Sequence, residues 1–272
     1  MSHLAETFAA AKADGRAALI AYLPAGFPSV VDCVPVIAAM VENGVDAVEI
    51  GLPYSDPLMD GPVIQAAVDK ALTSGVRIAD VMETVSGVVG TGAPSLVMSY
   101  WNPIERYGVE RFASELAAAG GCGVITPDLT PEEAGAWIDA TDEHGIDRVF
   151  LVAPSSSDER LATVASTCTG FVYAASTMGV TGARTTVSSA APALVERVRQ
   201  VTNIPVCVGL GVSTGQQAAD VAAYADGVIV GSAFVKALLD APSPAEGAAA
   251  AAALAAELAT GVRSAAKAGS TR

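Results

Sequence analysis

A short apolar strand followed by a turn and a helix recurs along the chain, and this repeat limits the possible folds more than any other feature. Eight apolar segments of strand length are each followed by turn residues and then by a segment with helical periodicity. The predicted strands are Ala18–Tyr22, Ala47–Gly51, Ser95–Tyr100, Gly123–Ile125, Arg148–Val152, Phe171–Ala175, Pro205–Gly209 and Gly227–Val230. Most are apolar on both faces, as parallel strands covered by helices are. The repeat therefore favours an α/β fold closed into a (β/α)8 TIM barrel over an open doubly wound sheet.

The segments between the strands predict the helices that would surround such a barrel. They are Leu4–Ala13, which is extra to the repeat and N-terminal to it, Ser29–Asn43 with Ser29 as N-cap, a helix that starts at Pro62, one extra helix between Thr73 and Thr91, Val109–Ala119, Pro131–Glu143, Asp158–Thr167, Ala191–Val201, Thr214–Tyr224 and a terminal helix at about Ala245–Ala266. The 272 residues suit one barrel, so we expect a single domain over residues 1–272.

Charge and cysteine usage exclude several classes of partner and location. The net charge of -14 argues against nucleic acid or an anionic membrane, because such a surface repels both. The cysteines at positions 33, 122, 168 and 207 are widely spaced, form no CxxC pair, and follow no secretory signal. No apolar run approaches the ~18 residues that span a bilayer. We therefore expect a cytoplasmic protein with reduced cysteines in its core.

Glu49 is the anomaly among the predicted strands, because it puts a carboxylate at the centre of the apolar segment Ala47–Gly51. The loop that follows is rich in Pro, Gly and Asp, and it carries a second carboxylate, Asp60, just before Pro62 starts a helix. In barrels the chemistry lies at the C-terminal ends of the strands, where Glu49 falls. Two acids at this end form a candidate acid–base pair.

Each of these acids also has a purely structural explanation. Glu49 could be a charge paired with an arginine at the barrel floor. Asp56 and Asp60 could be turn residues, since Asp-Pro and Asp-Gly favour turns. Asp60 is the stronger candidate for chemistry, because Gly61 and Pro62 already supply the turn residues.

Other catalytic groups are missing from the loops where chemistry is expected. His3 lies in the N-terminal segment and His144 at the end of a predicted helix, so no histidine base or metal cluster is predicted on the catalytic face. None of the lysines, at positions 12, 70, 236 and 267, ends a strand, which disfavours a Schiff base. No GxSxG, Walker A or GxGxxG motif opens a helix after a strand. By elimination, acid–base work falls to the carboxylates, with no metal.

Glycine-rich loops follow the last three predicted strands and suggest a phosphate site. The residues expected to contact phosphate are Gly182, Gly211, Gly231 and Ser232. Glycine lets backbone N–H groups approach an anion, and Ser232 is predicted to cap a helix whose N-terminus adds a positive dipole end. Glycines also end strands and cap helices routinely, but their joint position after strands six to eight favours phosphate binding.

Tyrosines stand at the ends of three predicted strands. Tyr22, Tyr100 and Tyr173 could be packing residues, but together they would also line a pocket for an aromatic substrate. They are therefore candidate substrate contacts.

The segment Glu49–Gln65, EIGLPYSDPLMDGPVIQ, resembles the signature of the tryptophan synthase α subunit family. Further similar positions are Tyr100 with Asn102, Asp128, Gly179-Val180-Thr181-Gly182, Gly209 to Gly211, and Gly231-Ser232, so that the resemblance runs from about Tyr22 to Lys236. It implies a TIM barrel lyase that cleaves indole-3-glycerol phosphate to indole and glyceraldehyde 3-phosphate, with Thr181 among the substrate contacts.

The resemblance also implies roles for the carboxylates and a partner. Glu49 would serve as acid and base, and Asp60 would accept the indole N–H. No cofactor is expected in this chain, whereas a pyridoxal-phosphate β subunit would join it in an α2β2 complex through Pro53, Asp56 and Leu58. A free-standing lyase that releases indole, and a regulatory barrel that activates a partner, remain open alternatives.

Overall fold

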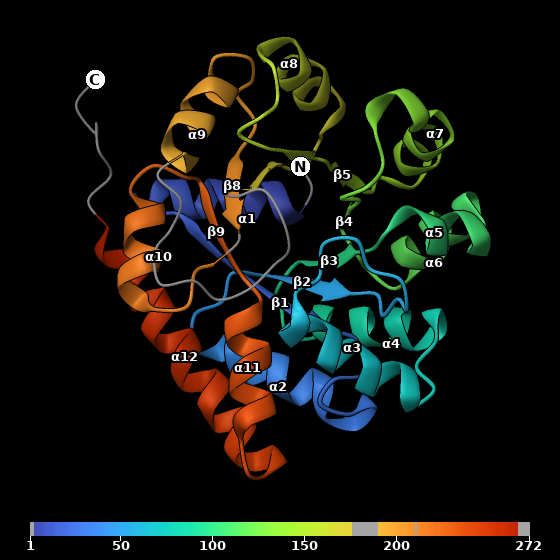
Figure 1. Cartoon of the computed structure of the whole chain (residues 1–272), viewed down its shortest axis with the longest axis vertical. Helices are drawn as coiled ribbons and strands as arrows, with labels where there is room; N and C mark the ends of the chain where they lie inside the picture. Colours follow the sequence, from blue (N-terminus) through green and yellow to red (C-terminus); the bar gives the residue numbers. More distant parts are fainter. Residues whose placement is uncertain (1–2, 176–189, 210, 266–272) are drawn as a thin grey trace.

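The strands form one parallel sheet that curves into a barrel (Figure 1). The computed structural model describes residues 3–175, 190–209 and 211–265. The strands are β1 (Ala18–Pro24), β2 (Ala47–Gly51), β3 (Ser95–Met98), β4 (Gly123–Ile125), β5 (Asp147–Val149), β6 (Leu151–Val152), β7 (Val172–Ala175), β8 (Val206–Gly209) and β9 (Gly227–Val230). Their order in the sheet is β5-β4-β3-β2-β1-β9-β8-β7-β6.

The predicted barrel is confirmed, and Phe150 explains why the described residues form nine strands where eight were expected. β5 pairs with β4 and β6 pairs with β7, and only Phe150 separates the two segments in the chain. They are two halves of the predicted strand Arg148–Val152, so the two ends of the sheet order are covalently joined. The Phe150 carbonyl accepts a hydrogen bond from the Tyr173 N–H at 3.1 Å, which continues the ladder across the break.

A ring of helices surrounds the strands in Figure 1. The helices are α1 (His3–Ala13), α2 (Val30–Glu42), α3 (Pro62–Thr73), α4 (Ile78–Val89), α5 (Trp101–Tyr107), α6 (Val109–Ala118), α7 (Gly135–His144), α8 (Asp158–Thr167), α9 (Ala191–Arg199), α10 (Gly215–Ala222), α11 (Ser232–Asp240) and α12 (Pro244–Ser264), with a 3-10 turn at Pro131–Glu133. Ser29 caps α2 as predicted, since its side chain accepts the Asp32 N–H. Helix α5 was not predicted, and β3 ends at Met98, two residues before the predicted end of that strand at Tyr100.

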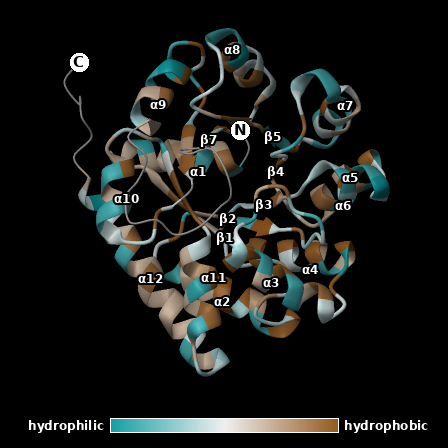
Figure 2. Ribbon diagram, viewed as in Figure 1, coloured by the Kyte–Doolittle hydropathy of each residue, from teal (hydrophilic) through white to brown (hydrophobic). Residues whose placement is uncertain are grey.

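Alternation along the strands separates two apolar cores. Leu19, Val48 and other outward residues pack under the helices, whereas Ala18, Ile20, Ala47 and their counterparts on other strands fill the barrel interior. Helix α1 closes one end of this interior, where the Phe8 ring meets the Phe171 ring edge-on at 5.9 Å between centroids. In Figure 2 teal, hydrophilic segments lie on the outer helices α7, α8 and α10.

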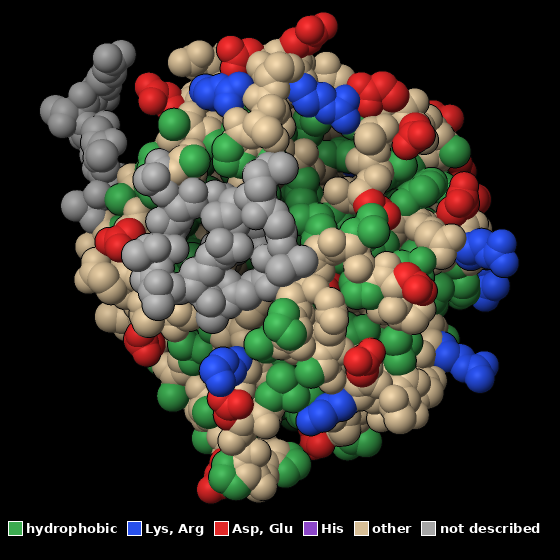
Figure 3. Space-filling model, in the orientation of Figure 1, with side chains coloured by type: hydrophobic (Ala, Val, Ile, Leu, Met, Phe, Trp, Pro, Cys, Tyr) green, Lys and Arg blue, Asp and Glu red, His purple; other side chains and the backbone are tan. Residues whose placement is uncertain are grey.

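On the face shown in Figure 3, acidic side chains are scattered around the rim and do not gather in one patch. All four cysteines are buried and free, as predicted. Among the described helices, none has the length and apolarity that crossing a membrane requires.

Candidate functional site

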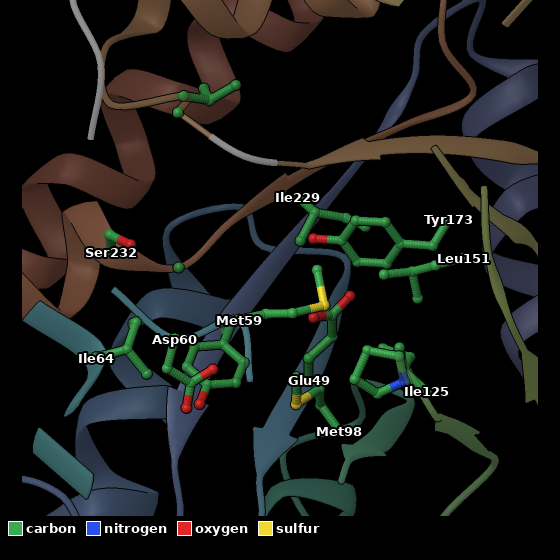
Figure 4. Close-up of a pocket in the computed structure, with 15 residues that line it drawn as sticks. Glu49, Met59, Asp60, Ile64, Met98, Ile125, Leu151, Tyr173, Ile229 and Ser232 are labelled. Carbon is green, nitrogen blue, oxygen red and sulfur yellow. The ribbon is translucent and has the colours of Figure 1, made fainter. Parts of the chain in front are cut away.

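A cavity that opens to solvent lies at the C-terminal end of the strands (Figure 4). Side chains from seven of the strands and from the loops above them line it. The lining residues are Tyr22, Glu49, Met59, Asp60, Ile64, Met98, Ile125, Pro127, Leu151, Tyr173, Gly211, Val212, Ile229, Gly231 and Ser232. Within the described part of the chain, the titratable members of this lining are two carboxylates and two tyrosines.

Strand parity aims Glu49 into this cavity. Ala47 packs in the barrel interior, and Glu49, two residues further along β2, points to the same side one layer nearer the mouth. Its side chain is 2% exposed, and Oε1 has no hydrogen-bond partner in the described structure. Burial raises the pKa of the Glu49 carboxyl from 4.5 to about 8. The described structure therefore does not support the alternative that Glu49 is a structural charge paired with an arginine at the barrel floor.

Asp60 reaches the same cavity from the loop after β2, and Tyr100 holds it. The Tyr100 hydroxyl donates a 2.8 Å hydrogen bond to Asp60 Oδ1, and it accepts one from the Met59 N–H at 3.0 Å. Burial raises the pKa of the Asp60 carboxyl, and the hydrogen bond from Tyr100 opposes this rise. Tyr100 itself is buried behind Asp60 and is absent from the cavity lining, unlike Tyr22 and Tyr173. This geometry therefore supports a contact of Tyr100 with Asp60 rather than with the substrate.

Two strand-end glycines make room for the tyrosines that do line the cavity. A Cβ at Gly51 would lie 2.3 Å from the Tyr22 hydroxyl oxygen, and one at Gly209 would lie 2.0 Å from that of Tyr173. Both distances are shorter than a van der Waals contact, so glycine at these two positions leaves the space that the tyrosine rings occupy at the barrel mouth. Gly209, which ends β8 two residues before Gly211, thus makes room for Tyr173.

The predicted phosphate residues lie at one side of the cavity, with one correction. Gly211 has a φ of 95°, which favours glycine, and Gly231 and Ser232 line the wall at the start of α11. The N-cap of α11 is Gly231, without a side-chain cap, so the prediction that Ser232 caps this helix was wrong. Ser232 is instead its first residue, because the chain already has helical geometry there. Thr181 and Gly182 lie outside the described residues.

The predicted partner segment is only partly at the surface. Leu58 is 69% exposed and Asp56 is also exposed, with its carboxylate accepting a 2.6 Å hydrogen bond from the Ser55 hydroxyl. Pro53, by contrast, is buried in this chain. Exposed apolar area is thus concentrated at Leu58.

Sequence reasoning missed the apolar lining and Met59 above all. Figure 4 shows the Met59 side chain extending from the loop into the cavity, where the Glu49 carboxyl also points. Inward parity along β3, β4, β6 and β9 could have identified Met98, Ile125, Leu151 and Ile229. Nothing in the local sequence indicates where Met59 points.

Among the described residues, no histidine or lysine lines this cavity. His144 ends α7, where Nε2 lies 2.5 Å from Glu110 Oε1, and it is not a cavity residue. Lys70 lies over the Phe27 ring, and Lys236 pairs with Asp240, both outside the cavity lining.

Fold and site define a (β/α)8-barrel enzyme whose cavity at the strand ends joins two buried carboxyl groups to a glycine-lined wall. Comparison with known proteins identifies the family. Residues 8–264 match the family model described as tryptophan synthase alpha chain, and the chain belongs to this family.

Close relatives cover nearly the whole chain. The tryptophan synthase alpha chain of Thermobifida fusca is 58% identical over 98% of this chain and 100% of its own length. That of Streptomyces coelicolor is 60% identical over 96% of each. A solved structure of Mycobacterium tuberculosis tryptophan synthase has a TM-score of 0.90 and 55% identity, over 96% of this chain and 98% of the other.

Proposed function

We propose that this chain is the lyase subunit that cleaves indole-3-glycerol phosphate to indole and glyceraldehyde 3-phosphate, with Glu49 and Asp60 as its acid–base residues. One observation carries the assignment of these residues: two buried carboxyl groups line one cavity. Glu49 Oε1 has no hydrogen-bond partner among the described residues, and Asp60 accepts a hydrogen bond from Tyr100. Their environments differ, and such a difference separates acid from base roles.

The buried Glu49 suits the proton transfers of a retro-aldol cleavage. With a pKa of about 8 it is mostly protonated at neutral pH, so it can give its proton to the indole carbon that bears the side chain. The resulting carboxylate then takes the proton of the side-chain hydroxyl. The electrons of that O–H bond form the aldehyde carbonyl, and those of the broken carbon–carbon bond return to the ring. Glu49 ends protonated again.

Asp60 suits the charge that develops on the ring. Protonating the indole carbon places positive charge on the ring nitrogen, and a carboxylate that accepts the indole N–H stabilises this charge. The hydrogen bond from Tyr100 favours the ionised form of Asp60 and so supports this role.

Binding of the substrate divides the cavity between its two walls. Tyr22, Tyr173 and the apolar lining would take the indole, whereas Gly211, Gly231, Ser232 and the N-terminus of α11 would take the phosphate, together with Thr181 and Gly182. The first N–H groups of a helix have no partner within it, which makes α11 an anion site.

A β subunit completes the proposed function. We infer that Pro53, Asp56 and Leu58 contribute to docking it in an α2β2 complex, that pyridoxal phosphate belongs to that subunit, and that this chain needs no cofactor or metal for its own step. The exposure of Leu58 supports a contact there. Four free buried cysteines support a cytoplasmic location, and the joined sheet supports one domain.

Conservative removal of each acid tests the proposal. Glu49→Gln and Asp60→Asn should each lower indole release at least ~10²-fold, since each removes an acid–base or charge-stabilising group. Asp56→Asn, assayed like the others in the isolated chain without a β subunit, is the matched control, because it changes an exposed carboxylate of the same loop. More than a tenth of parental turnover in Glu49→Gln would overturn the assignment, and so would a larger loss in Asp56→Asn than in Asp60→Asn.

A further inference from the structure

Tyr100 is the point where both ends of the loop after β2 meet. Its single hydroxyl binds two consecutive residues, donating to Asp60 Oδ1 at 2.8 Å and accepting the Met59 N–H at 3.0 Å. A tyrosine hydroxyl has one proton to donate, and here it is given to the carboxylate. Because Tyr100 is 3% exposed, both contacts are shielded from water.

The start of the same loop packs on the ring of Tyr100. The Tyr54 ring lies with its centroid 5.7 Å away at an interplanar angle of 42°. The Tyr54 hydroxyl accepts a 3.0 Å hydrogen bond from Asn102 Nδ2. Tyr54 therefore contacts both the N-cap residue of α5, Tyr100, and a residue within that helix, Asn102. Between Tyr54 and Met59 the loop is largely exposed.

The backbone at Tyr100 is itself anchored to the neighbouring barrel strand. Tyr100 is the N-cap of α5, and the next N–H, that of Trp101, donates a 2.8 Å hydrogen bond to Asp128 Oδ1 on the loop after β4. Tyr100 is thus held by the barrel, and Asp60 lies on a loop that is held by Tyr100.

We propose that Tyr100 is the positioning residue for Asp60, and that Tyr54 acts as its buttress. Tyr100 does not line the cavity, so it acts through Asp60 rather than on the substrate. This inference rests on the proposed function for its catalytic consequence, whereas the contact with Asp60 can be measured without any activity.

Tyr100→Phe separates positioning from packing, because it keeps the ring and removes both hydrogen bonds. We expect kcat to fall at least ~10-fold while KM changes less than ~3-fold, as misplacing a group by about an ångström costs rate more than binding. Loss of the donor should also raise the pKa of Asp60. The acid limb of kcat/KM, which follows ionisation of Asp60, should therefore move to higher pH. The other titratable groups lining the described cavity are Glu49, Tyr22 and Tyr173, and the substitution leaves them in place.

Matched variants and a direct titration complete the test. Tyr54→Phe should be near normal, and Tyr54→Leu, which removes the ring contact, should show part of the Tyr100→Phe defect. Tyr224→Phe controls for hydroxyl loss, since the described structure gives that buried hydroxyl no partner. The pKa of Asp60 is measured by carbon-13 NMR of labelled aspartate, assigned with Asp60→Asn.

The outcomes distinguish this inference from the proposed function. An unchanged Asp60 pKa in Tyr100→Phe, or an unchanged kcat and acid limb, would overturn the positioning role. If Tyr100→Phe does not fold, parental kcat in Tyr54→Leu would overturn the buttress and with it the proposed arrangement. A parental chain without cleavage activity would refute the proposed function, and the NMR titration would still decide whether Tyr100 acts on Asp60.

Discussion

Replacing Glu49 with glutamine should stabilise the folded chain while it removes activity. The pKa of this carboxyl rises from 4.5 to about 8 because burial disfavours the charged form. The unfolded chain ionises freely above pH 4.5, whereas the folded chain keeps the proton until about pH 8. The free energy of unfolding is therefore fully retained below pH 4.5 and declines as the pH rises toward 8.

The magnitude follows from the two pKa values. Each tenfold change in the protonation equilibrium is worth about 1.4 kcal/mol, so the full difference amounts to about 5 kcal/mol. By linkage, Glu49 should cost about 1 kcal/mol at pH 5, about 3 kcal/mol at pH 7 and about 5 kcal/mol at pH 9. Glutamine mimics the protonated acid in size and polarity, so the Glu49→Gln variant should escape this cost.

Urea unfolding of both proteins at pH 5, 7 and 9 measures the difference directly. The stability gap should widen with pH and level off above about pH 8. Asp56→Asn, an exposed carboxylate of the same loop, should leave the gap near zero throughout. A gap between Glu49→Gln and the parent that is independent of pH would refute burial as the source of the raised pKa, and with it the protonated acid proposed for catalysis.

Three further outcomes test other parts of the site. Gly231→Val should raise the KM for indole-3-glycerol phosphate at least ~10-fold with a smaller change in kcat, because side-chain bulk would enter the proposed anion wall. Met59→Ala should move the alkaline limb of the pH profile to lower pH, because water gains access to Glu49 and lowers its pKa. Saturation with a β subunit should raise the cleavage rate at least ~10-fold, in keeping with couplings of ~1–3 kcal/mol, and Asp56→Ala should weaken the association.

Two of these outcomes have a matched control variant on the same chain, and each has a result that would contradict it. Gly135→Val tests glycine replacement where a Cβ would meet no atom within 4 Å. An equal rise in KM for Gly135→Val would argue against the anion wall. If Met59→Ala leaves the alkaline limb of the pH profile unchanged, Met59 does not shield Glu49 from water. Asp69→Ala removes an exposed carboxylate from α3, and equal weakening by it would deny Asp56 a specific contact.

The sequence by itself determined the repeat and the position of the acids along it. Strand and helix periods are local properties, so the eight units could be counted without knowing how they pack. Glu49 was recognisable for the same reason, since a carboxylate within an apolar strand stands out against its neighbours. The division of one predicted strand at Phe150 could not be foreseen in this way. The residues before Phe150 pair with β4 and those after it pair with β7, and strand pairing is a long-range property.

Only the tertiary structure decided what each loop residue faces. Tyr100 was predicted to contact substrate because it ends a strand, yet β3 stops at Met98 and the chain turns so that the Tyr100 hydroxyl meets Asp60. Closure of the barrel also put Tyr173 over Gly209, a use of glycine that no motif indicates. Contacts between residues 40 positions apart, such as that of Tyr100 with Asp60, depend on register and barrel closure, which local sequence patterns do not encode.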